Sequence, residues 1–142
     1  MRKIAILLLA ALLLAGCGKT QESAIQTTQP TETTAPQEAY MNITQEEAKK
    51  LMDTEKDYII LDVRTKEEYD EKHIPGAVLI PVDEIEDRAV RELPEKDQLI
   101  LVYCRSGNRS KTASEALEKL GYTRIREFGG INDWPYDIVA AS

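Results

Sequence analysis

Cysteine, histidine, tryptophan and phenylalanine are scarce in this chain of 142 residues, which has two Cys, one His, one Trp and one Phe. Two cysteines cannot build a disulfide-rich scaffold. The few Cys and His residues show no spacing typical of metal ligands, and no glycine-rich nucleotide motif is present. The 7 Gly and 6 Pro are too few for a collagen-like or wholly low-complexity chain. We therefore expect neither a metal ion nor a bound cofactor.

Positive charge is also in deficit, because 18 Lys+Arg stand against 25 Asp+Glu, a formal net charge of -7. An acidic chain repels phosphate backbones, so we expect no nucleic-acid partner. The length fits a single domain. These averages nevertheless combine unlike segments of the chain, which have to be separated first.

The N-terminus has the pattern of an export signal. Arg2 and Lys3 precede an apolar run from Ile4 to Ala15, which is shorter than the roughly 20 residues of a membrane-spanning helix. A short anchor helix is the alternative. Leu14-Ala15-Gly16-Cys17 resembles the lipobox of bacterial lipoproteins. The resemblance implies that residues 1–16 are a cleaved lipoprotein signal peptide and that Cys17 carries acyl chains such as palmitate. It also implies a domain anchored to a bacterial membrane on its extracytoplasmic side.

Residues 17–41 predict a flexible tether that follows the lipidated cysteine. This segment is rich in Thr, Gln and Pro and has little apolar surface to offset the entropy of ordering. Residues 42–142 remain for one folded domain. Without residues 1–16 the chain has 16 basic and 25 acidic residues, so its formal net charge is 16 − 25 = −9.

The folded domain alternates buried strands with helices. Thr44 with Glu47, and Thr65 with Glu68, have the spacing of capping boxes at helix starts. The predicted helices begin near residues 44, 65, 83 and 110, and the predicted strands cover 58–63, 77–80, 98–103 and 124–128. In the helix that begins at Asp83, the predicted apolar face consists of Ile85, Ala89, Val90 and Leu93. This order predicts an α/β fold in which helices flank a mostly parallel central sheet.

One loop joins a hydrophobic strand directly to a helix: Cys104-Arg105-Ser106-Gly107-Asn108-Arg109-Ser110. In α/β folds ligands bind beyond the carboxyl ends of strands. Loop amides and a helix N-terminus can hold a thiolate there, so we expect the pKa of Cys104 to lie below its ordinary value. Arg105 and Arg109 add positive charge. An inert core cysteine is the alternative interpretation.

Residues 58–134 resemble a single-domain rhodanese, a sulfurtransferase. The resemblance rests on Leu61-Asp62-Val63-Arg64, His73-Ile74-Pro75-Gly76-Ala77, the Cys104 loop and Gly129-Gly130-Ile131 with Trp134. It implies the rhodanese-like three-layer fold. It also implies that Cys104 carries sulfane sulfur as a persulfide, taken from a donor such as thiosulfate or another persulfide. The acceptor would be a thiol or cyanide, with a protein as a further alternative, and we expect a monomer.

The resemblance also assigns roles to the neighbours of Cys104. Arg105, Ser106, Gly107, Asn108 and Arg109 would bind the substrate, with Arg105 facing an anionic donor and Arg109 bracing the loop. Asp62, Arg64 and Ser110 would stabilise the loop without binding the substrate, and the partner of Asp62 would be Arg64 or Arg109. Ser106 departs from the lysine of many thiosulfate-preferring relatives, which leaves the donor open. We expect His73 to be structural.

Loop length separates the reaction classes that use such loops. Four residues lie between Cys104 and Arg109, whereas the related protein-tyrosine phosphatase and arsenate reductase loops have five. By resemblance, the shorter loop indicates sulfur transfer. A binding or persulfide-sensing module with little turnover stays open as an alternative, and a phosphatase or arsenate reductase is disfavoured.

Overall fold

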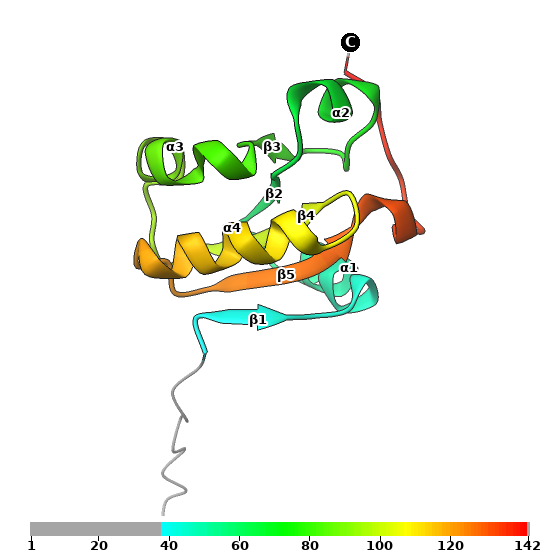
Figure 1. Ribbon diagram of the computed structural model, residues 1–142. Coiled ribbons are helices and arrows are strands. Elements are labelled where there is room, and N and C mark those ends of the chain that lie inside the picture. Colours follow the sequence, from blue (N-terminus) through cyan, green and yellow to red (C-terminus); the bar gives the residue numbers. More distant parts are fainter. Residues whose placement is uncertain (1–37, 142) are drawn as a thin grey trace, which may run out of the picture. The chain divides into compact units, whose positions relative to one another are not determined.

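The computed structural model describes residues 38–141, and the predicted signal peptide and Cys17 lie outside this range (Figure 1). Its strands are β1 Tyr40–Asn42, β2 Tyr58–Asp62, β3 Val78–Leu79, β4 Leu99–Cys104 and β5 Ile125–Gly130. Its helices are α1 Gln45–Thr54, α2 Lys66–Glu71, α3 Ile85–Glu92 and α4 Asn108–Lys119, with short 3-10 turns η1 Val82–Glu84 and η2 Ile131–Asp133. The predicted α/β class is confirmed.

The five strands form one sheet in the order β1-β5-β4-β2-β3, and all pairs are parallel. Strand β4 is central and every one of its residues is buried. Its neighbours are β2, in which Asp62 pairs with Tyr103, and β5, in which Glu127 pairs with Val102. The carboxyl ends of three parallel strands therefore meet where β4 delivers Cys104.

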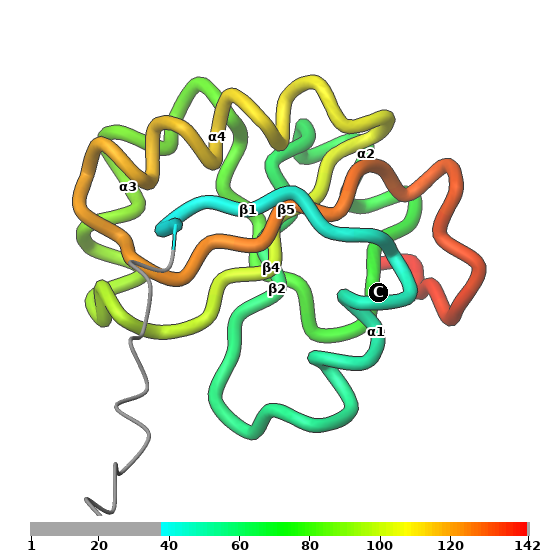
Figure 2. The backbone as a smooth tube through the Cα atoms, turned by 90° about the horizontal axis from the view of Figure 1, so that it is seen from below, coloured from blue at the N-terminus to red at the C-terminus, as the bar shows by residue number. Residues whose placement is uncertain are grey.

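Helices cover both faces of the sheet. Seen from below, α3 and α4 lie on one side of the strands and α1 lies on the other (Figure 2). Successive strand residues point to opposite faces, so β4 contributes to two separate clusters. Ile100, Val102 and Cys104 join the α3–α4 cluster, whereas Leu99, Leu101 and Tyr103 join the α1 cluster.

Both predicted capping boxes are confirmed. Thr44 accepts a hydrogen bond from the Glu47 amide at the start of α1, and the Glu47 carboxylate accepts one from the Thr44 amide. Thr65 and Glu68 form the same pair at the start of α2. Each box satisfies two amides that the helix itself leaves without partners.

The structure departs from the sequence analysis at three places. Tyr40 and Met41, which we assigned to the tether, form strand β1 and pair with β5. Val90 is 51% exposed, so its assignment to the buried face of α3 was wrong. Strand β5 continues through Gly130, whereas the predicted strand ends at residue 128. Within residues 38–141, no helix is both long enough and apolar enough to span a bilayer.

Candidate active site

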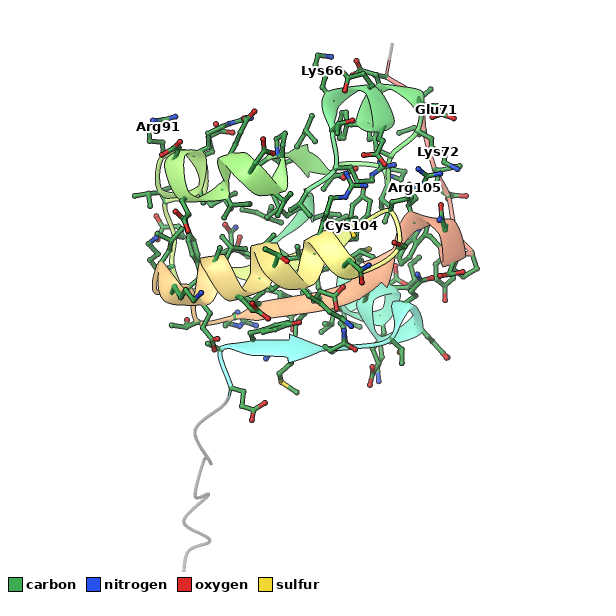
Figure 3. All side chains as sticks on the ribbon, viewed as in Figure 1. Lys66, Glu71, Lys72, Arg91, Cys104 and Arg105 are labelled. Atoms are coloured by element: carbon green, nitrogen blue, oxygen red, sulfur yellow. The ribbon has the colours of Figure 1, made fainter. Side chains whose placement is uncertain are left out.

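Cys104 ends β4 and its side chain turns into the loop that precedes α4. Figure 3 shows it beneath Arg105, on the side of the molecule that also carries Glu71 and Lys72. The residue is 1% exposed, and the Gly107 amide donates a hydrogen bond to its Sγ at 3.1 Å. The loop therefore curls around the sulfur, as the sequence predicts for an anion-binding loop at a helix start.

The surroundings of Cys104 favour its thiolate. Burial raises the pKa of the thiol, but hydrogen bonds from the Ser110 hydroxyl and from the amides of Ser110, Gly107 and Ser106 outweigh burial and lower it. Three converging amides also aim at the position of any negative charge that develops on a sulfur attached to Cys104. The direction matches the expectation from sequence.

Two glycines permit this loop shape. Gly107 has a φ of +103°, in the left-handed region that residues with side chains rarely adopt. Gly130, at the end of β5, lies directly against the loop, and an added Cβ would come within 2.2 Å of the Arg105 carbonyl oxygen. A side chain at either position would force the loop away from Cys104.

Arg109 braces the loop from outside. Its guanidinium donates to both carboxylate oxygens of Glu68, at 2.7 and 2.8 Å, and so ties the first turn of α4 to α2. Glu68 thus combines helix capping with loop bracing. Only the first of these roles could be predicted from sequence, because the spacing of a capping box is local whereas Arg109 lies 41 residues away.

Asp62 pairs with Arg64, the first of its two predicted candidates, and not with Arg109. The Arg64 side chain donates to Asp62 Oδ1 at 2.9 Å and to Oδ2 at 2.6 Å. Arg64 is 2% exposed and Asp62 is 0% exposed. The Tyr103 hydroxyl donates to Asp62 at 2.6 Å and accepts the Ile74 amide. This network fixes the end of β2 beside the end of β4.

A polar pocket of about 140 Å³ opens beside the loop, between α2 and η2. Its lining residues are Arg64, Glu68, Glu71, Lys72, Arg105, Ile131 and Asn132. Among residues 38–141, no ion pair and no side-chain hydrogen bond holds the Arg105 guanidinium. Arg105 is therefore the loop cation that is available to a ligand, whereas Glu68 neutralises Arg109.

The remaining predicted residues differ in how they meet the site. Ser106 and Asn108 are exposed, and neither side chain has a hydrogen-bond partner within the described range. Ser110 is buried, and its hydroxyl oxygen lies 2.5 Å from Glu127 Oε1 and 2.9 Å from the Gly107 carbonyl oxygen. Sequence reasoning missed Glu127. Its sequence signal is weak, because the predicted strand 124–128 also contains the charged residues Arg124 and Arg126.

His73 lies on the far side of the Asp62 network. Its ring stacks on Tyr69, with centroids 3.8 Å apart, and Nδ1 lies 2.8 Å from the Tyr69 carbonyl oxygen. Its backbone forms an antiparallel bridge with Val139. These contacts account for the residue by packing and hydrogen bonding.

The chain is similar to known sulfurtransferases. It is 38% identical over 73 residues to thiosulfate sulfurtransferase PspE of Escherichia coli (strain K12), which covers 51% of this chain and 70% of that protein. It is 40% identical over 88 residues to a sulfurtransferase of Allochromatium vinosum, a match that covers 61% of this chain and 79% of that protein. Other curated relatives are longer, and the chain spans 49% of one from Bacillus subtilis (strain 168).

Solved structures agree with this similarity. A rhodanese-like domain protein from Staphylococcus aureus superposes with a TM-score of 0.62 at 33% identity, over 71% of this chain and 98% of that one. Another solved structure, of a "rhodanese with anions from E. coli", superposes with a TM-score of 0.56 at 35% identity. The match covers 58% of this chain and 98% of that one. The model of the rhodanese-like domain family matches residues 44–136. The chain therefore belongs to the rhodanese-like domain family and is a rhodanese-type sulfurtransferase.

Proposed function

We propose that the protein is a membrane-anchored sulfurtransferase on the extracytoplasmic side of a bacterial membrane. It moves sulfane sulfur through a persulfide on Cys104, from an anionic donor such as thiosulfate to a thiophilic acceptor. The observation that carries the chemistry is the convergence of loop amides on a buried cysteine at the start of α4. The lipobox-like residues before Cys17 carry the anchoring.

The reaction would be a double displacement. The Cys104 thiolate attacks the outer sulfur of the donor, the donor S–S bond breaks, and its electron pair leaves with the remainder of the donor, which is sulfite when thiosulfate reacts. An acceptor thiolate or cyanide then attacks the outer sulfur of the persulfide and releases the Cys104 thiolate. Proton transfer to the sulfur is not required, and the loop amides stabilise the anion in both steps.

An anionic donor suits the cations beside the loop. Arg105 has no partner among the described side chains and shares its pocket with Lys72 and Glu71. The other two charged residues of the pocket, Arg64 and Glu68, are paired with Asp62 and Arg109. PspE is named for thiosulfate, and the similar E. coli rhodanese is described with anions. Lys72 can supply the charge that Ser106, in place of a lysine, does not.

Mass spectrometry of the intact protein tests the persulfide. The full-length chain carrying Cys17→Ala has Cys104 as its only thiol. After incubation with thiosulfate it should gain the mass of one sulfur atom and lose it to cyanide. Equal gain by the Cys17→Ala/Cys104→Ser variant would contradict the proposal. Sulfur uptake without steady-state transfer would identify a sensing module instead.

Arg105→Ala tests donor binding separately. Loss of one charged contact should raise the KM for thiosulfate about tenfold, because such a contact contributes about 1.5–3 kcal/mol. The matched control is Arg91→Ala, since Figure 3 places Arg91 at the opposite end of the molecule. An unchanged KM in Arg105→Ala would remove this residue from the donor site.

Labelling with palmitate tests the anchor. Cells producing the wild-type chain should yield labelled protein in the membrane fraction, and Cys17→Ala should abolish the label, because the thioether needs the thiol. Label on Cys17→Ala, or unlabelled wild type, would contradict the assignment of a lipoprotein.

A further inference from the structure

Glu127 is a completely buried carboxylate for which the sulfur-transfer steps have no use. It is 0% exposed and lies in β5, next to the active-site strand. Its Oε1 accepts from the Gly129 amide at 2.8 Å and lies 2.5 Å from the Ser110 hydroxyl. Its Oε2 accepts from the side-chain amide of Asn42 in β1. None of these partners is a cation, and no Lys or Arg of residues 38–141 forms an ion pair with it.

A buried charge without a counter-ion is expensive to keep, because water is replaced by neutral donors only. The carboxylate sits where it can act on the loop: a Cβ added at Gly107 would lie 3.9 Å from Oε1. The position points to a role at the active site.

The link to Cys104 runs through one proton. A hydrogen bond from the Ser110 hydroxyl lowers the pKa of Cys104, and the hydroxyl oxygen is also 2.5 Å from Glu127 Oε1 and 2.9 Å from the Gly107 carbonyl oxygen. A serine hydroxyl has a single hydrogen to donate. A carboxylate at 2.5 Å accepts it better than a thiolate does, since charge-assisted O–H···O bonds are the shorter and stronger ones. Glu127 and the sulfur therefore compete for the Ser110 hydroxyl hydrogen, and the short contact to Glu127 favours the carboxylate.

We propose that Glu127 is a positioning residue for sulfur transfer, whose carboxylate accepts the Ser110 hydroxyl hydrogen bond and so weakens the donation of that hydroxyl to the Cys104 sulfur. This inference rests on the proposed function. The thiolate is then held mainly by the loop amides. A thiolate with fewer donors is more basic and is the stronger nucleophile toward sulfur. Glu127 thereby lowers the fraction of Cys104 that is ionised at a given pH and raises the nucleophilicity of each thiolate.

Glu127→Gln tests this with little change of shape. The glutamine keeps an oxygen for Gly129, and the Asn42 amide can turn over to accept its N–H. Its neutral carbonyl oxygen is a weaker acceptor for the Ser110 hydroxyl than the carboxylate. Both consequences of the change act in one direction: a negative charge is lost, and the Ser110 proton is freed for the sulfur. The other charges near Cys104 stay in place, namely Arg105, the Arg109–Glu68 pair and Asp62.

The readout is the ultraviolet absorbance of the thiolate as a function of pH. It is measured on the full-length Cys17→Ala chain and corrected with its Cys104→Ser counterpart. In Glu127→Gln the titration midpoint should fall, and the limiting rate of sulfur uptake from thiosulfate at high pH should drop roughly twofold, because nucleophilicity declines with pKa. An unchanged or raised midpoint would overturn the proposal.

Two further variants separate positioning from plain electrostatics. In a Ser110→Ala background, Glu127→Gln should shift the midpoint by less than half as much, because no hydroxyl proton remains to be released; an equal shift would overturn the relay. Glu118→Gln removes one exposed charge from α4 and should leave the midpoint in place; a matching shift would also overturn it. The titration needs no sulfur donor, so a failure of the proposed function would show instead as absent sulfur uptake in every variant.

Discussion

Two buried carboxylates flank the active-site strand, and they are held in opposite ways. Asp62, in β2, forms a bidentate pair with Arg64 and accepts the Tyr103 hydroxyl. Glu127, in β5, has only neutral donors. Both are 0% exposed and lie in strands that pair with β4, Asp62 at the end of β2 and Glu127 in the middle of β5.

The difference separates a structural role as a scaffold, that of Asp62, from the proposed role of Glu127 in tuning the reactivity of Cys104. An ion pair that satisfies all its members fixes local geometry and leaves little that binding or chemistry can change. A buried carboxylate with a hydroxyl as its nearest donor keeps a proton that could go elsewhere. The Asp62 side of Cys104 therefore sets the position of the loop, and the Glu127 side adjusts the sulfur.

The largest effect is expected on the scaffold side. Asp62→Asn leaves the buried Arg64 guanidinium without its counter-charge, so the free energy of unfolding should fall by about 3–5 kcal/mol. Urea unfolding followed by circular dichroism measures it. The double variant Asp62→Asn/Arg64→Met also removes the unpaired Arg64 cation, and it should recover at least half of the lost free energy of unfolding. A loss below about 1 kcal/mol in the single variant would show that the pair is not a scaffold.

Sequence predicted the scaffold side better than the other side, because its interactions are local. Asp62 and Arg64 are two residues apart, and both capping boxes span three. The contacts of Glu127 reach 17 residues to Ser110 and 85 to Asn42. No spacing rule covers such distances.

Strand β1 was missed for the same physical reason. Its three residues carry no periodic pattern of their own and acquire a structure only by pairing with β5. The Cys104 loop, in contrast, was predictable as a unit, because strand, glycine, arginine and helix start are contiguous. Val90 was misassigned because, at about 100° per residue, it lies about 140° around the helix from Ile85 and outside the buried stripe of Ile85, Ala89 and Leu93.

An intermediate effect is expected at the partly exposed Glu68–Arg109 pair. Hydrogen bonds from Arg109 are the main reason why the pKa of Glu68 falls from its ordinary 4.5 to about 2. A lowered pKa in the folded state stabilises the protein above the unfolded-state value, and this contribution disappears as the pH falls from 4.5 towards 2. Solvent screening reduces it to about 1–2 kcal/mol.

Glu68→Gln isolates that contribution. Glutamine keeps the capping box, so the variant should lose about 1–2 kcal/mol at pH 7 and show a weaker loss of stability between pH 5 and pH 2. Urea unfolding at several pH values measures both. Glu67→Gln, at an exposed neighbouring position, is the matched control and should follow the wild type. An identical acid dependence in Glu68→Gln and wild type would assign the acid sensitivity to other groups.

The smallest effect on stability is expected at Glu127, although its effect on the sulfur is the one proposed above. Glu127→Gln strands no cation, and the loss of charge-assisted hydrogen bonds is offset by the removal of a desolvated charge, so the free energy of unfolding should change by less than about 1 kcal/mol. Urea unfolding at pH 7 measures this change and compares it with that of Asp62→Asn, which also replaces a carboxylate by an amide. A loss as large as that of Asp62→Asn would mean that Glu127 is a second scaffold, and the contrast between the two sides of Cys104 would not hold.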